Sequence, residues 1–140
     1  MPADQTYVEI VKGAVKDIFD NKFKANAVKA MDKAAEAAVK KAGKLTLDKP
    51  KEKGAKGWSL DSSLESLAPD KAGKLLEGKV SMVVSTWPGK SLKAMPTAKA
   101  SITIRGADKV SAAEVEDLAG ALVESAMKSA VKFMEGTKPE

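Results

Sequence analysis

The stretch GKVSMVVSTW, residues Gly78–Trp87, decides the fold class because its side chains alternate with a period of two. In an extended chain, alternate residues point to opposite faces. One face here is apolar and the other is mixed: the first carries Val80, Met82 and Val84, and the second carries Ser81, Val83, Ser85 and Trp87. The pattern predicts a strand in a sheet that is covered on one face only.

Two further stretches repeat this alternation. In GWSLDSSLESL, which begins at Gly57, apolar residues share one face, namely Trp58, Leu60 and Leu64. In AKASITIRG, which ends at Gly106, every second residue is apolar up to Ile104. The segment APDKAG supplies turn residues between the first two strands, and the second strand can begin as early as Lys74. Strands joined in this way favour a three-stranded antiparallel meander over residues 57–106.

Helical spacing lies on both sides of this predicted sheet. Residues 4–42 are predicted to be helical, as one helix or as two with a break near Asp20, because apolar residues recur there every three or four positions. Thr6 and Glu9 match the capping-box pattern at its start. Residues 111–135 are predicted to form the last helix, with a capping box of Ser111 and Glu114 and a stop at Gly136.

The elements combine into one predicted α+β domain over residues 1–140. Its architecture is a two-layer sandwich, with an N-terminal helix or two, the three-stranded antiparallel meander, and a C-terminal helix packed on one sheet face. The helices are expected to cover the face that carries Leu60, Val84 and Ile102. Because a flexible linker precedes the sheet, the N-terminal helix can pack on its own sheet or on that of a neighbouring copy.

That linker is KLTLDKPKEKGAKG, residues 44–57, in which no periodicity survives. It carries five lysines against the two acids Asp48 and Glu52, which leaves a net charge of +3. The lysines form a candidate site for an anionic partner, such as nucleic acid, anionic lipid or an acidic polymer. They are Lys44, Lys49, Lys51, Lys53 and Lys56.

Cysteine and histidine are both absent from the 140 residues. Disulfides, thiolate nucleophiles, zinc clusters and imidazole bases are therefore absent too. The remaining catalytic candidates are Ser91 beside Lys90 or Lys93, and the acids Asp61 and Glu65, and both sets fit a solvated surface better. We expect no enzyme, no cofactor and no metal site.

The segment WPGKS ends like a nucleotide-binding P-loop but is predicted to be the end of a strand. A P-loop requires a glycine five residues before Gly89, and Val84 stands there instead. Pro88 has no backbone N–H to offer to a phosphate, and Pro96 prevents a long helix from following. Pro-Gly instead suits the centre of a type II turn.

The loop Pro88–Thr97 is longer than a hairpin requires and mixes large apolar residues with lysines. Long loops in compact domains often bind partners. The candidate partner-binding residues are Trp87, Lys90, Leu92, Lys93 and Met95. Trp58 can lie near Trp87 across the sheet. The alternative to partner binding is that Trp87 closes one end of the core.

The sequence thus predicts a non-enzymatic interaction, structural or accessory domain that can associate with itself through sheet edges or a helix face. The alternative function is lysine-dependent binding of an anionic partner. The net charge is +5, but Arg105 is the single arginine among 24 basic residues, which favours a solvated surface. The expected location is the cytoplasm, or the periplasm or exterior if Met1 replaces a removed signal peptide.

Overall fold

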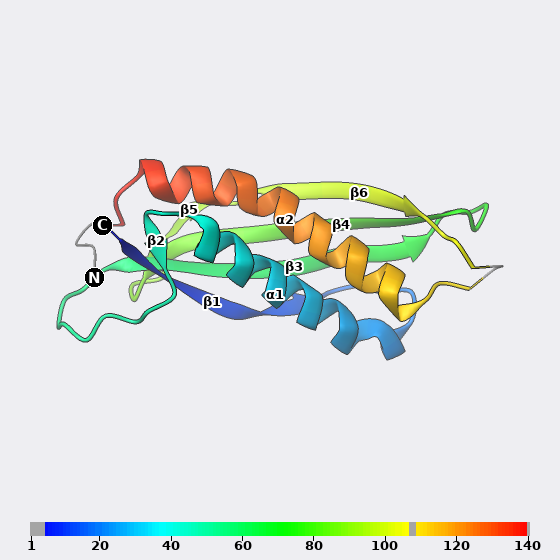
Figure 1. The fold of residues 1–140 in the computed structure, drawn as a ribbon, viewed down its shortest axis with the longest axis horizontal. Helices are drawn as coiled ribbons and strands as arrows, with labels where there is room; N and C mark the ends of the chain where they lie inside the picture. Colours follow the sequence, from blue (N-terminus) through cyan, green and yellow to red (C-terminus); the bar gives the residue numbers. More distant parts are fainter. Residues whose placement is uncertain (1–4, 107–108, 140) are drawn as a thin grey trace.

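Figure 1 shows the computed structural model, which describes residues 5–106 and 109–139, as a twisted sheet with two helices on one of its faces. The strands are β1 (Thr6–Val15), β2 (Leu45–Thr46), β3 (Gly57–Pro69), β4 (Leu75–Trp87), β5 (Leu92–Ala94) and β6 (Thr97–Thr103). The helices are the 3₁₀ turn η1 (Asn21–Phe23), α1 (Lys24–Lys41) and α2 (Ala112–Gly136). The fold is α+β, as predicted. Met1 and the other residues at the ends of the predicted domain, 1–4 and 140, lie outside the described residues.

The sheet has six strands and is mixed, so the prediction of a three-stranded antiparallel meander is wrong. Its order is β2-β1-β3-β4-β5, and β6 also pairs with β4. β1 is parallel to both β2 and β3. β4 is antiparallel to β3, β5 and β6. The meander prediction therefore describes β3, β4 and β6, but it misses the parallel strands β1 and β2 and the short antiparallel strand β5, which lies in the predicted loop Pro88–Thr97.

The prediction of helix throughout residues 4–42 is wrong for residues 6–15, which form β1, whereas α1 is helical as predicted. β1 is rich in β-branched residues, which favour strands. In its pairing with β3, Val11 lies opposite Asp61 and Ala14 lies opposite Ser63, so β1 contains one extra residue. This bulge shifts the alternation by one position and makes the apolar spacing resemble that of a helix.

The predicted linker, residues 44–57, is held at its start. Thr6 N donates to the carbonyl oxygen of Lys44 at 2.8 Å, and Lys44 N donates to Glu135 Oε2 at 3.4 Å. β2 lies within this segment and extends the sheet beyond β1. The loop beyond β2 is mostly exposed and turns at Gly54, which has a φ of 80°. The linker is thus a part of the sheet followed by an exposed loop.

The core lies between the sheet and the two helices. α1 buries a residue every fourth position, at Ala27, Met31, Ala35 and Val39, and α2 does the same at Leu118, Leu122, Ala126 and Ala130. These side chains cover the sheet face that carries the buried Leu60 and Val84, as predicted. Many of them are alanines, and small residues let helices pack closely. A Cβ on Gly120 of α2 would lie 3.9 Å from the carbonyl oxygen of Ala30 in α1.

The predicted capping box at the start of α2 is confirmed. Glu114 N donates to Ser111 Oγ at 3.2 Å, and Ser111 N donates to Glu114 Oε1 at 3.0 Å. We expect Ser111→Ala to lower the free energy of unfolding by about 1 kcal/mol, because a helix N–H loses its partner. Urea unfolding measures this loss, with Ser129→Ala on the exposed surface of α2 as the control. Equal stability of the two variants would contradict the prediction.

Candidate functional site

The sheet face that carries no helix, here called the outer face, is polar. Side chains of β1, β3 and β4 that point away from the helices line up across the strands, because Glu9 pairs with Ser59 and Ser59 pairs with Ser85. Ser59 and Ser85 are buried although no helix covers them. Other parts of the chain therefore cover this end of the outer face.

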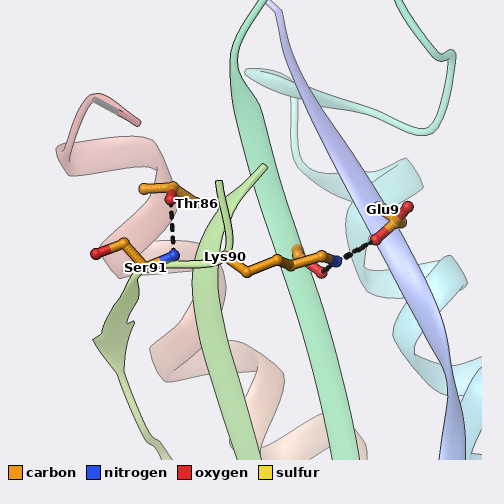
Figure 2. A network of polar contacts seen from close by, with 5 residues as sticks. Glu9, Thr86, Lys90 and Ser91 are labelled. Atoms are coloured by element: carbon orange, nitrogen blue, oxygen red, sulfur yellow. Dashed lines mark hydrogen bonds and ion pairs between the residues drawn. The ribbon is translucent and has the colours of Figure 1, made fainter. Parts of the chain in front are cut away.

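Three side chains meet there in what we call the Glu9 cluster, which consists of Glu9, Ser59 and Lys90. Lys90 Nζ donates to Glu9 Oε1 and to Ser59 Oγ, and Ser59 Oγ donates to Glu9 Oε1 at 3.1 Å. Figure 2 shows the Lys90 side chain reaching across β3 to Glu9 on β1. The cluster therefore ties the loop after β4 to two other strands.

A tight turn positions Lys90. Lys90 N donates to the carbonyl oxygen of Thr86 at 2.7 Å, and Ser91 N donates to Thr86 Oγ1 at 3.0 Å (Figure 2). Lys90 has a φ of 60°, in the left-handed region that costs a non-glycine residue about 1 kcal/mol. The predicted type II turn requires this conformation at Gly89 instead, so that prediction is wrong. β4 does end at Trp87, which confirms that WPGKS is the end of a strand.

The cluster determines how Glu9 ionises. The hydrogen bond from Lys90, with a smaller contribution from Ser59, lowers the pKa of the Glu9 carboxyl, and burial opposes this shift. Burial, with the nearby Glu9 charge, raises the pKa of the Tyr7 hydroxyl. Ser59 contacts a lysine, as in Ser–Lys nucleophile pairs, but it is 0% exposed and no substrate can reach its hydroxyl. The geometry suits a clamp between strands.

A lowered pKa in the folded protein means that ionised Glu9 stabilises the fold above its ordinary pKa, and that this contribution is lost as the pH falls through the lowered value. We expect Glu9→Gln to be less stable than the unchanged protein at neutral pH. The difference should shrink below about pH 4, where glutamate is protonated in the unfolded chain. Urea unfolding over a series of pH values measures it. A difference that does not change with pH would contradict this role of the Glu9 charge.

A second cluster of the same composition lies further along the outer face. Glu65 accepts hydrogen bonds from Lys16 Nζ at 3.2 Å and from Ser81 Oγ at 2.9 Å. These bonds, with Lys16 as the larger cause, lower the pKa of the Glu65 carboxyl. Lys16 immediately follows β1, and β3 is irregular between Leu64 and Ser66. The second cluster thus holds β1, β3 and β4 together where their pairing is irregular.

Two aromatic rings lie beside the Glu9 cluster. Tyr7 and Trp87 meet edge to face, with ring centroids 4.7 Å apart, and both pair with Gly57 on β3. Lys49 Nζ lies 5.9 Å from the centroid of the Trp87 ring, within reach of a cation–π contact. Trp58 lies on the helix side of the sheet, 5.5 Å from the Phe133 ring. Trp58 and Trp87 are thus close along the paired strands β3 and β4, but their side chains lie on opposite faces of the sheet, and Trp87 covers the outer face instead of the core.

The structure separates the predicted binding residues into two groups. Lys90 belongs to the Glu9 cluster, Trp87 lies beside that cluster, and Lys49 from the linker lies at the Trp87 ring. Leu92, Lys93 and Met95 lie at and just after β5, at the edge of the sheet. Leu92 is 57% exposed and Met95 is 56% exposed. We call these three residues the β5 edge.

The linker lysines do not converge on one point. Lys44 is held by backbone hydrogen bonds, Lys49 lies at Trp87, and the rest are exposed, namely Lys51, Lys53 and Lys56. Tyr7, Glu9 and Ser59 were not predicted as site residues. The signal that could have found Glu9 and Tyr7 is the β-branched composition of residues 6–15, since a strand there places both on one polar face.

Within residues 5–106 and 109–139, neither helix is long and apolar enough to cross a membrane. In the same described part of the chain, no group of three acidic side chains is placed to hold a metal ion.

The fold and the clusters define a two-layer α+β protein whose mixed sheet has one helix-covered face and one polar face. The chain resembles solved structures of this class. It matches a Xanthomonas campestris protein of the family DUF330, with a TM-score of 0.62 and 11% identity over 97% of this chain and 90% of that one. It also matches a hypothetical protein from Chlamydia trachomatis, with a TM-score of 0.55 and 10% identity over 94% and 96%.

A third similar structure is a PelC dodecamer from Paraburkholderia phytofirmans, with a TM-score of 0.54 and 12% identity over 89% of this chain and 88% of that one. No family model matches the sequence, and no curated protein matches it closely enough to count as a relative. At these identities the likeness establishes the fold alone.

Proposed function

We propose that this protein is a non-enzymatic interaction domain that associates with copies of itself and binds a protein partner at the β5 edge. The observation that carries the proposal is the exposure of Leu92, the first residue of the three-residue strand β5, and of Met95, the residue directly after it. Large apolar side chains that cluster on a surface are typical of protein contacts. Lys93 between them adds a charge that can select the partner.

The backbone at this edge supports the proposal. Among the described strands, β5 and β6 pair only with β4, so the far side of each has unpaired N–H and C=O groups. An extended segment of another chain can add to such an edge by main-chain hydrogen bonds. Self-association is supported further by the PelC protein, which has a similar fold and forms a dodecamer.

A photo-activated crosslinking residue at position 93, introduced in the cells that make the protein, tests this function. We expect a specific protein adduct, which disappears in the Leu92→Ser/Met95→Ser variant because the apolar contact is lost. The matched control carries the crosslinker at the exposed Lys71, in the turn between β3 and β4. Adducts at position 93 no stronger than those at 71, or adducts that persist in the variant, would reject the β5 edge as a binding site.

A second candidate function is binding of an anionic partner by the exposed loop after β2. Lys51, Lys53 and Lys56 are exposed, and none of them forms an ion pair among the described residues. Binding through such lysines weakens steeply between low and physiological salt. Titration with duplex DNA and with anionic vesicles, with Lys51→Gln/Lys53→Gln/Lys56→Gln as the variant, tests it. An affinity that does not change with the salt concentration, or that the variant retains in full, would exclude this function.

A further inference from the structure

The exposed side of the two helices carries a groove along their seam. It consists of two adjoining hollows of about 490 and 510 Å³, which share Ala34 of α1 and Glu124 of α2. The helices run side by side in the same direction (Figure 1). Alanine and glycine residues form much of the groove floor, among them Ala30, Ala38 and Gly120.

The two walls of the groove carry opposite charges. α1 contributes Lys29, Lys33 and Lys41 and no carboxylate that lines the groove. α2 contributes four carboxylates and one lysine, namely Glu116, Asp117, Glu124, Glu135 and Lys128. The α1 wall therefore has a net charge of +3 and the α2 wall a net charge of −3.

These opposite charges are not joined within the described chain. Its ion pairs connect Lys16 to Glu65, Lys22 to Asp20 and Lys90 to Glu9, and none of them bridges α1 and α2. The polar contact between the two walls is a hydrogen bond from Asn26 Nδ2 to Glu116 Oε2 at 2.8 Å. Glu135 also accepts a hydrogen bond, from Lys44 N. Lys33 and Glu124 take part in none of the ion pairs or side-chain hydrogen bonds of the described residues, so both remain available to a second molecule.

We propose that a second copy of this chain occupies the groove, related to the first by a two-fold axis that runs parallel to the helices above their seam. This inference rests on the proposed self-association and names its interface. Such an axis places α1 of each copy over α2 of the other at the same level, so that Lys33 faces Glu124 in two equivalent contacts. A two-fold axis perpendicular to the helices would instead place α1 over α1, with lysine against lysine. The repulsion between these like charges excludes that arrangement.

The size of the surface fits a dimer contact. The groove follows α2 from Glu116 to Glu135, a length of about 30 Å at 1.5 Å per residue. Two packed helices are about 20 Å wide, so each copy presents roughly 600 Å². A standard interface takes about 800 Å² from each partner, so the helix layer alone supplies most of that area.

The test uses the full-length chain and two charge reversals, Lys33→Glu and Glu124→Lys. Each variant alone places like charges at both symmetric contacts. We therefore expect its dimer dissociation constant to rise at least tenfold, so that light scattering gives a mass close to that of the monomer under the same conditions. In an equimolar mixture of the two variants, opposite charges face each other again at both contacts, the reversed pair at one and the native Lys33 and Glu124 at the other. We therefore expect the mixture to recover the dimer mass in light scattering. Lys71→Glu, which does not line the groove, is the control with the same charge change as Lys33→Glu.

The outcomes separate the inference from the function on which it rests. A wild-type protein that stays monomeric at all concentrations would overturn both the self-association and this interface. An oligomer whose mass neither variant changes would overturn the interface alone. Folded variants that dissociate but do not recover the dimer mass on mixing would overturn it too. That result would mean that Lys33 and Glu124 act on each other within one chain and not across the interface.

Discussion

Replacing Trp58 by alanine is expected to lower the free energy of unfolding by about 3 to 5 kcal/mol, the usual cost of removing a large buried aromatic side chain. Trp58 is 0% exposed and packs against Phe133 of α2, at a centroid distance of 5.5 Å. Its removal leaves a cavity between β3 and the end of α2. Because native domains are stable by only about 5 to 15 kcal/mol, this variant can unfold at moderate temperature.

Trp58→Phe is the informative comparison. Trp58 Nε1 is buried and has no hydrogen-bond partner among the described residues. Burying such a donor costs about 1 to 3 kcal/mol, and phenylalanine has no donor. We therefore expect the loss of volume to be largely offset, so that Trp58→Phe keeps most of the stability. Urea unfolding followed by circular dichroism measures both variants, with the exposed Leu92→Ala as a control. Equal losses for phenylalanine and alanine would contradict this prediction.

The second large effect is expected for Gly57→Ala. A Cβ at this position would lie 2.4 Å from the backbone carbonyl oxygen of Tyr7, a distance that real side chains do not adopt. β1 and β3 must therefore move apart, and the edge-to-face contact of Tyr7 with Trp87 is lost with them. We expect the free energy of unfolding to fall by about 1 to 3 kcal/mol, as for other residues forced into a packed space.

Gly43→Ala is the matched control, because a Cβ there meets nothing within 4 Å. Urea unfolding compares the stabilities, and the near-ultraviolet circular dichroism of the aromatic residues reports whether the Tyr7 and Trp87 rings still pack. If Gly57→Ala equals Gly43→Ala in both measurements, the close approach of β1 to β3 does not occur in solution.

The sequence alone could predict those parts of the fold that depend on neighbours along the chain. β3, β4 and β6 follow one another and alternate with a period of two, and α2 begins at a capping box within four residues. Each signal is contained in the segment itself. Local patterns therefore predicted three of the antiparallel strands and the C-terminal helix, but not the short strand β5 within the predicted loop Pro88–Thr97.

β1 could not be predicted in this way, because its partner β3 begins more than forty residues later and runs parallel to it. The bulge after Val11 also changes the face on which later residues lie, so the apolar spacing of this strand resembles that of a helix. The Glu9 cluster could not be predicted for the same reason. Glu9 and Lys90 are 81 positions apart, so only the correct placement of β1 brings them together.

The parallel pairing of β1 also bears on how the protein is made. Residues 6–15 leave the ribosome before β2 and β3, so β1 has no strand to join until those strands have followed. By contrast, β4 pairs with β3 and with β6, which are its near neighbours along the chain, and such local contacts form early. We therefore expect β1 to join β3 after the antiparallel strands have paired. Until then the valines and the isoleucine of β1 stay exposed, so we expect β1 to be a site at which the unfinished chain aggregates.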